Sequence, residues 1–158
     1  MKIIRIDQLN KEKAAAYFQE NWGSPQMVIS TGIYHCDELP GFAAIDWNNN
    51  IVGLITFVDR PGEREIISLD ASIEGQGAGS GLLNAAEADA KEKGISRMAL
   101  ITTNDNLHAL RFYQKRGYQL TKVLRNAVEE ARKIKPEIPL LGYDGIPIRD
   151  ELILEKEI

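Results

Sequence analysis

The distribution of apolar and polar residues along the chain predicts short strands mixed with amphipathic helices. Short apolar runs predict strands at residues 2–6, 43–47, 51–58, 64–72, 97–102, 118–124 and 151–155. Apolar residues three or four positions apart predict helices at 10–21, 79–93, 105–116 and 126–134. The segment 22–42 contains several glycines and prolines and is predicted to be irregular.

Turn residues separate these elements and define their order. Asn48, Asn49 and Asn50 predict a hairpin turn, because asparagine tolerates the left-handed conformation. Gly94 is expected to end the helix 79–93 at the C′ position. The resulting order predicts a mixed α/β (α+β) fold whose first half is mostly antiparallel, with a single domain over residues 1–158.

Composition narrows the classes of protein that the chain can be. Its 158 residues can build one substantial core, and its single cysteine, Cys36, cannot form an internal disulfide. The N-terminus does not resemble a signal peptide and no segment is apolar enough to span a bilayer, so we expect a cytoplasmic protein without a membrane partner. The net charge of −4 argues against nucleic acid as a partner and would suit a cationic amine substrate.

The most informative segment is 65–81, in which a predicted strand enters a glycine-rich turn and a helix follows. Glycine lets a diphosphate approach the backbone, and the first N–H groups of the helix can then bind the anion. The spacing fits neither the dinucleotide G-x-G-x-x-G fingerprint nor a P-loop. It fits x-x-x-G-x-G at residues 74–79. A glycine turn needed only for packing is the alternative interpretation.

A second motif follows one helix and one strand later. Residues 102–118 read Thr-Thr-Asn-Asp-Asn-Leu-His-Ala-Leu-Arg-Phe-Tyr-Gln-Lys-Arg-Gly-Tyr, containing Asn-x-x-Ala-x-x-x-Tyr and a Gly-aromatic pair. With the glycine turn upstream, the chain resembles the GNAT family of N-acetyltransferases from its first strand to about Leu124. The resemblance implies the GNAT fold, in which two central parallel strands, here 64–72 and 97–102, splay apart. One departure is Glu74, because the family's loop typically begins with Gln or Arg.

The same resemblance implies that acetyl-CoA is the co-substrate. No spacing of His, Cys, Asp or Glu in the chain suggests a metal site. The resemblance assigns cofactor binding to the end of the first splayed strand, to the glycine turn and to the later motif. These residues are Leu69, Ala71, Gln76, Gly77, Ala78, Gly79, Ser80, Gly81, Asn104, Asn106, Ala109 and Tyr113.

Tyr113 is the predicted acid of the reaction. Helical spacing places it on one face with Asn106, Ala109 and Leu110, and a phenol with a pKa of about 10 keeps its proton at neutral pH. It could therefore protonate a departing CoA thiolate. The alternative is a core tyrosine, and for Asn106 the alternative to cofactor contact is a helix cap shared with Asn104 and Asp105.

Two carboxylates compete for the role of general base. Glu65 occupies the position where many GNAT enzymes carry a glutamate, and it is preferred over a surface salt-bridge role. Asp70 is the alternative; in a regular strand it would face the opposite side of the sheet from Glu65. His35 and Cys36 lie in the variable segment that usually shapes the acceptor pocket in this family.

The sequence as a whole predicts an acetyl-CoA-dependent N-acetyltransferase that acts on a primary amine by direct attack in a ternary complex. The alternatives are a non-catalytic acyl-CoA sensor of the same fold and an interaction module whose glycine turn binds nothing. A homodimer is possible by analogy. The long segment 135–150 is expected to border the acceptor pocket or a dimer contact.

Overall fold

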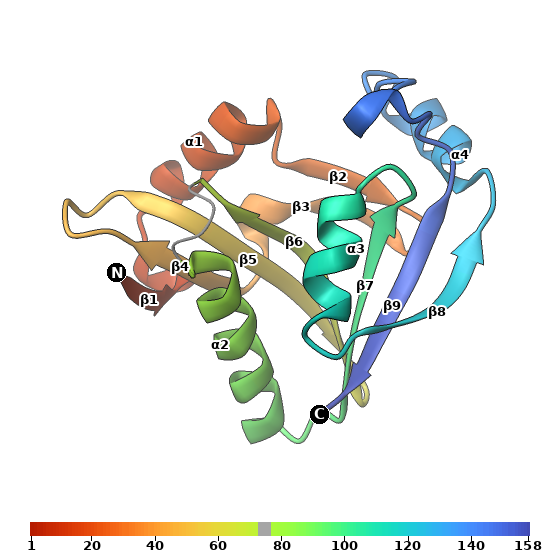
Figure 1. The fold of residues 1–158 in the computed structure, drawn as a ribbon. Helices are drawn as coiled ribbons and strands as arrows, with labels where there is room; N and C mark the ends of the chain where they lie inside the picture. The colour runs from red at the N-terminus through yellow and green to blue at the C-terminus, as the bar shows by residue number, and fades with distance from the viewer. Residues whose placement is uncertain (73–76) are drawn as a thin grey trace. The chain divides into compact units, whose positions relative to one another are not determined.

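The computed structural model describes residues 1–72 and 77–158, which form two compact units (Figure 1). The first unit comprises 1–27, 34–98 and 158, and the second comprises 28–33 and 99–157. The predicted fold class is confirmed: the fold is mixed α/β, with a mostly antiparallel sheet, one parallel pair of strands and four α-helices among the described residues. The splay of two central strands and the single domain remain predictions.

The first unit is built on four antiparallel strands in the order β1-β4-β5-β6. These are β1 (Lys2–Arg5), β4 (Gly41–Ile45), β5 (Ile51–Arg60) and β6 (Glu63–Ala71). Helix α2 (Ala78–Glu92) packs along one face of β4, β5 and β6 (Figure 1). Its apolar stripe, including Leu82 and Leu83, is fully buried there, which positions the helix directly after the glycine turn.

Local sequence signals determine where the helices of this unit begin and end. Asn10 caps helix α1 (Lys11–Trp22), since its side chain accepts a hydrogen bond from the N–H of Glu12. Gly77 (φ 78°) precedes α2, and Gly94 (φ 76°) follows it in the left-handed conformation, as predicted. The Asn48–Asn50 turn is also confirmed, with Asn49 at φ 66°.

A β-bulge in β6 corrects the sequence-based view of which side chains share a face. Thr56 of β5 pairs with Ser68, but the next residue, Phe57, pairs with Ile66, so Ile67 is an extra residue in β6. Because of this insertion, Glu65 and Asp70 pair with Val58 and Leu54, which lie an even number of residues apart on β5. The two carboxylates therefore face the same side of the sheet, whereas a regular strand would have separated them.

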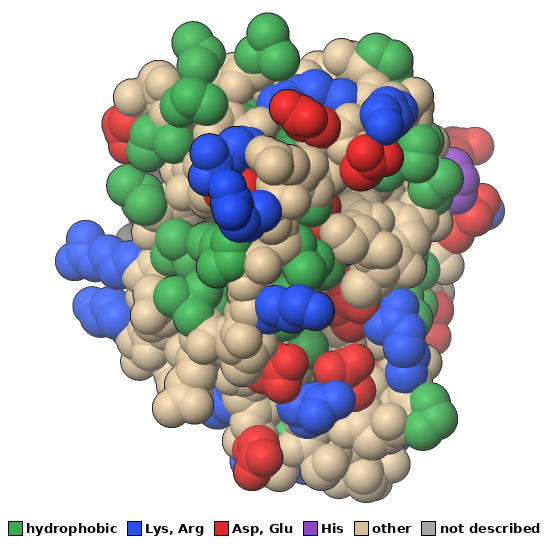
Figure 2. Space-filling view, turned by 90° about the vertical axis from the view of Figure 1, so that its right-hand side faces the viewer, with side chains coloured by type: hydrophobic (Ala, Val, Ile, Leu, Met, Phe, Trp, Pro, Cys, Tyr) green, Lys and Arg blue, Asp and Glu red, His purple; other side chains and the backbone are tan. Residues whose placement is uncertain are grey.

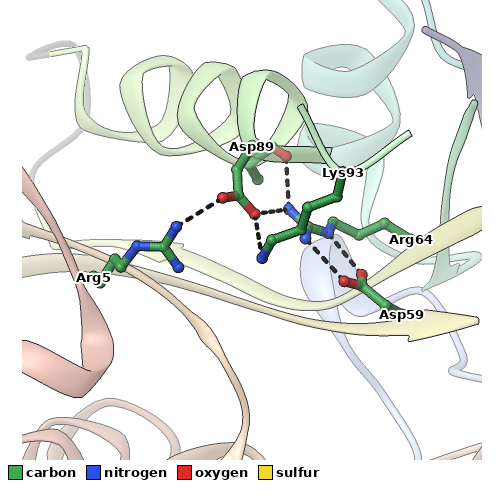
Figure 3. Close-up of polar contacts among 6 residues, drawn as sticks. Arg5, Asp59, Arg64, Asp89 and Lys93 are labelled. Atoms are coloured by element: carbon green, nitrogen blue, oxygen red, sulfur yellow. Dashed lines mark hydrogen bonds and ion pairs between the residues drawn. The ribbon is translucent and has the colours of Figure 1, made fainter. Parts of the chain in front are cut away.

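An ion-pair network ties several elements of the first unit together (Figure 3). The buried carboxylate of Asp89 on α2 contacts Arg5 of β1 at 3.0 Å, Arg64 of β6 at 2.9 Å and Lys93 at 3.1 Å. The Arg64 guanidinium is fully buried, also pairs with Asp59 of β5 at 2.7 Å, and lies 3.6 Å from the centre of the Phe57 ring. The network therefore joins β1, β5, β6 and α2.

The second unit contains strands in the order β7-β9-β8, two helices and a long loop. Its elements are β7 (Arg97–Thr103, of which the first two residues belong to the first unit), α3 (Leu107–Gln114), β8 (Gln119–Leu124), α4 (Ala127–Ile134) and β9 (Glu151–Glu157). β8 and β9 pair antiparallel, and Tyr118 and Leu154 are fully buried. These elements lie close to their predicted ranges.

One prediction about the early part of the chain is wrong. The segment expected to be irregular contains a small two-stranded sheet, β2 (Gln26–Ile29) and β3 (Gly32–His35). Its tip belongs to the second unit, where Ser30 donates hydrogen bonds from its N–H and its hydroxyl to the carboxylate of Glu151. Two strands of four residues each are too short to give a clear period in the sequence.

Apolar side chains also reach the surface, and Figure 2 shows several of them among charged groups on one face. The large apolar residues of the second unit that are exposed are Ile33, Leu107, Leu120, Val123, Ile134, Leu140, Leu141 and Tyr143. Within the described part of the chain, no helix is long and apolar enough to cross a membrane.

Candidate functional site

The glycine turn connects the end of β6 to the start of α2 in the first unit. Gly77 is exposed, Ala78 is buried, and Gly79, Ser80 and Gly81 are partly exposed on the first turn of the helix. No side chain of the described residues caps this helix start. The first-turn N–H groups of α2 have no intrahelical partner, as in every α-helix, so they are suited to hold an anion.

The remaining cofactor predictions of the first unit lie around this turn. Leu69 and Ala71 are half-buried near the end of β6, and they pair with Ile55 and Gly53 on the face opposite Asp70. The predicted contact Gln76 and the unusual Glu74 lie outside the described residues.

Helix α3 carries the later motif in the second unit. Asn106 is its N-cap, since its side-chain oxygen accepts a 3.0 Å hydrogen bond from the N–H of Ala109. The cap predicted as an alternative role for Asn106 is thereby confirmed. Its side-chain N–H₂ group forms no hydrogen bond with the described residues, so contact with a cofactor remains compatible with the cap.

Tyr113 lies on the same helix and is buried. Its ring packs edge-on against Phe112 and Tyr118, with centroids 5.2 and 5.4 Å away. Burial raises the pKa of the phenol above its ordinary value, so the hydroxyl keeps its proton throughout the neutral range. The hydroxyl forms no hydrogen bond with any described residue.

Asn104 makes contacts that the family resemblance did not predict. Its side-chain oxygen accepts hydrogen bonds from the N–H groups of Arg149 and Asp150, both at 3.0 Å. Its side-chain N–H₂ donates to the carbonyl of Pro147 at 2.9 Å. Three backbone groups of the long loop bond to this amide, and the Asn104 N–H also donates to the carbonyl of Asp150 at 3.1 Å, so Asn104 joins the start of α3 to that loop. Its contact with a cofactor remains a prediction.

Asp105 and Arg132 hold the rest of the loop. Asp105 accepts hydrogen bonds from the hydroxyl of Thr103 and the N–H of Tyr143. A side chain at Gly142 would have to displace Asp105, because its Cβ would overlap a carboxylate oxygen of that residue. Arg132 of α4 donates to the carbonyls of residues 138, 139 and 148 at 3.3, 2.8 and 2.6 Å. The loop is therefore closely fixed to the second unit.

Glu65, the preferred base, is buried on β6 and already paired. Its carboxylate accepts a 2.7 Å hydrogen bond from Arg60, and Arg60 donates a second bond to the hydroxyl of Tyr34. The guanidinium compensates the charge of the carboxylate, which favours the alternative interpretation of Glu65 as a salt-bridge residue. The salt bridge differs from the expected one because Glu65 is buried and does not lie at the surface.

Asp70, the alternative base, is half-buried, and among the described residues its carboxylate accepts a hydrogen bond from one hydroxyl group. The Tyr17 hydroxyl of α1 donates a 2.8 Å hydrogen bond to Asp70 Oδ2 and lies 3.0 Å from the hydroxyl of Ser72. The pKa of Tyr17 is raised mainly by burial and further by Asp70, so Tyr17 remains the donor. Tyr17 was not predicted as part of the site, because in the sequence it reads as one more apolar position of α1.

His35 and Cys36 do not form a common site in the structure. Cys36 is completely buried, whereas His35 is exposed at the end of β3. Their predicted part in shaping an acceptor pocket remains a prediction.

Known proteins provide an independent comparison. The chain matches the acetyltransferase (GNAT) family over residues 7–118. It is 57% identical over 158 residues to the uncharacterized protein YxbD of Bacillus subtilis and 49% identical to YdhI of the same bacterium, covering 100% of this chain and 99% of each relative.

Solved structures share the fold at low sequence identity. A GNAT acetyltransferase from Elizabethkingia anophelis with acetyl-CoA bound has a TM-score of 0.67 and 24% identity, over 76% of each chain. An aminoglycoside 6'-N-acetyltransferase complexed with coenzyme A has a TM-score of 0.70 and 18% identity, over 99% of this chain and 97% of that one. The motifs at 65–81 and 102–118 are thus those of a known family, and the chain belongs to the GNAT family of acetyltransferases.

Proposed function

We propose that the protein is an acetyl-CoA-dependent N-acetyltransferase that acts on a primary amine by direct attack in a ternary complex. The neutral amine attacks the thioester carbonyl, a C–N bond forms and the C–S bond breaks. The products are the N-acetylated amine and free CoA, with one proton released overall from an ammonium substrate. Membership of an acetyltransferase family and fold neighbours with CoA or acetyl-CoA bound support the transfer of an acetyl group in general.

The observation that carries this proposal is the junction between β6 and α2. The strand ends at Ala71, and α2 begins after Gly77 with no capping side chain among residues 1–72 and 77–158. At α1 and α3 an asparagine side chain satisfies an N–H of the first turn. At α2 no side chain of the described residues caps the first turn, and the pyrophosphate of CoA has the charge that a helix N-terminus stabilises.

Tyr113 supplies the acid in this proposal. Its raised pKa keeps the proton in place, but it also means that full proton transfer to a thiolate with a pKa near 8.5 is uphill. We therefore propose that the phenol acts mainly by hydrogen bonding to the developing thiolate, with the proton moving late. Its buried ring, held between Phe112 and Tyr118, would fix the direction of that bond.

Calorimetric titration with acetyl-CoA tests the proposed cofactor site. The wild-type protein should bind, and Gly79→Trp should abolish binding because its bulk occupies the first turn of α2. Ala88→Trp is the matched control, since it adds the same side chain to an exposed position of the same helix and should leave binding intact. Equal binding by wild type and Gly79→Trp would exclude this turn as the cofactor site. Binding without acetylation of any amine would favour the sensor.

A further inference from the structure

Two carboxylates face the same side of β6, but only one has a cationic partner. Arg60 compensates the charge of Glu65 at 2.7 Å. Asp70 forms no ion pair with any lysine or arginine of the described residues, and its one hydrogen bond comes from the neutral phenol of Tyr17. A half-buried carboxylate without a cationic partner has no neighbouring charge to compensate it where solvent screening is reduced. Of the two, Asp70 is therefore the one that can attract a cation.

The groups around Asp70 suit a particular kind of cation. Asp70 Oδ1 forms no hydrogen bond with the described residues. The Tyr17 hydroxyl donates to the other oxygen, Oδ2, and lies 3.0 Å from Ser72 Oγ. A primary ammonium group has three N–H donors. The Tyr17 hydroxyl bridges Asp70 Oδ2 and Ser72 Oγ, so Asp70 Oδ1 and Ser72 Oγ have lone pairs left that can accept from such a group. A quaternary ammonium has no N–H donor and would leave these acceptors unused.

We infer that Asp70 binds the primary ammonium group of the acceptor and takes a proton from it, while Tyr17 and Ser72 position the ammonium group. The inference rests on the proposed acetyl transfer. One N–H bond of the ammonium breaks and its proton goes to Asp70 Oδ1. The lone pair left on nitrogen forms the C–N bond as the C–S bond breaks. The second proton leaves the product nitrogen and balances the proton that the thiolate takes up to give free CoA, and Asp70 releases the first proton to water. Glu65 and Arg60 then form a structural pair of the same sheet face.

Carbon-13 NMR of the full chain, labelled at its Asp and Glu carboxyl carbons, tests the binding step without a known substrate. The Asp70 signal is assigned from its absence in Asp70→Asn. Propylammonium chloride, added in the presence of CoA, should shift the Asp70 signal saturably and leave the Glu65 signal in place. Tetramethylammonium chloride at equal concentration controls for ionic strength and should produce less than about a tenth of the shift. No saturable change at Asp70, or a larger change at Glu65, would overturn the inference.

The proton transfer is tested by assaying the acetylation of a panel of primary amines, measured as the release of free CoA. Asp70→Asn should lower kcat/KM by about 100-fold or more, within the range for loss of a general base, and Glu65→Gln should lower it much less. Tyr17→Phe should mainly raise KM for the amine and leave acetyl-CoA affinity unchanged, which a purely structural loss would not do. Thermal unfolding of each variant checks that it is folded.

The two arms separate the inference from the proposed function. If propylammonium binds at Asp70 but no amine is acetylated, the acetyltransferase activity fails and the ammonium site stands. If amines are acetylated and Asp70→Asn is as active as wild type, the activity stands and the inference fails.

Discussion

Tyr17 and Tyr113 are both buried, but their surroundings give the two hydroxyl groups different roles. The pKa of both Tyr17 and Tyr113 is raised above the ordinary value, mainly by burial. The Tyr17 proton is engaged by Asp70, so this phenol is a fixed donor within its own unit. The Tyr113 hydroxyl has no such partner among the described residues, so its proton is the one that can be donated to a bound ligand.

Replacement of Tyr113 by phenylalanine tests its role as the acid. The change removes only the hydroxyl and keeps the packing against Phe112 and Tyr118. We expect turnover with the best amine of a panel to fall by about 100-fold or more, with acetyl-CoA affinity unchanged. Tyr143→Phe, at a tyrosine that is 63% exposed, is the matched control and should keep full turnover. Undiminished turnover of Tyr113→Phe would reject the acid assignment.

At the scale of elements, periodicity located the helices and the long strands, but it could not locate features that depend on pairing. The bulge at Ile67 leaves no mark in the sequence, because Ile66 and Ile67 read as one apolar run. Only the register with β5 shows that Glu65 and Asp70 share a face. Likewise, the hydrogen-bond partners of Asn104 lie more than 40 residues later in the chain. The residues next to Asn104 in the sequence indicate only a helix cap.

The loop after α4 is expected to depend on Arg132. Because Arg132 donates to three loop carbonyls, Arg132→Ala should leave those groups to water and loosen the loop. We expect amide hydrogen exchange in 136–148 to accelerate by about 10-fold, which corresponds to roughly 1.4 kcal/mol. Lys133→Ala removes a neighbouring exposed cation and is the control, with unchanged exchange expected. Equal protection in Arg132→Ala would mean that Asn104 and Asp105 suffice to hold the loop.

For the molecule as a whole, resistance to acid should depend on the Asp89 network (Figure 3). Burial alone would raise the pKa of Asp89, but the hydrogen bonds and charges of Lys93 and Arg64 outweigh it and lower the pKa below its ordinary value. A carboxylate with a lowered folded-state pKa stabilises the fold above the unfolded-state pKa, near 3.9. This contribution is lost as the pH falls through the folded-state value.

Asp89→Asn should therefore cost stability at neutral pH and cost progressively less in acid. The substitution leaves the buried guanidinium of Arg64 with Asp59 as its remaining carboxylate partner, so the loss at pH 7 should be about 3–5 kcal/mol, as for other broken buried pairs. Urea unfolding of the wild type and of Asp89→Asn, at neutral pH and in steps below about pH 4, measures the difference in their free energies of unfolding. Asp7→Asn changes an exposed aspartate of the same unit, and its effect should stay within about 0.5 kcal/mol. If the difference between the wild type and Asp89→Asn is the same at every pH, Asp89 acts through packing, because acid removes the charge of its carboxylate but not its packing.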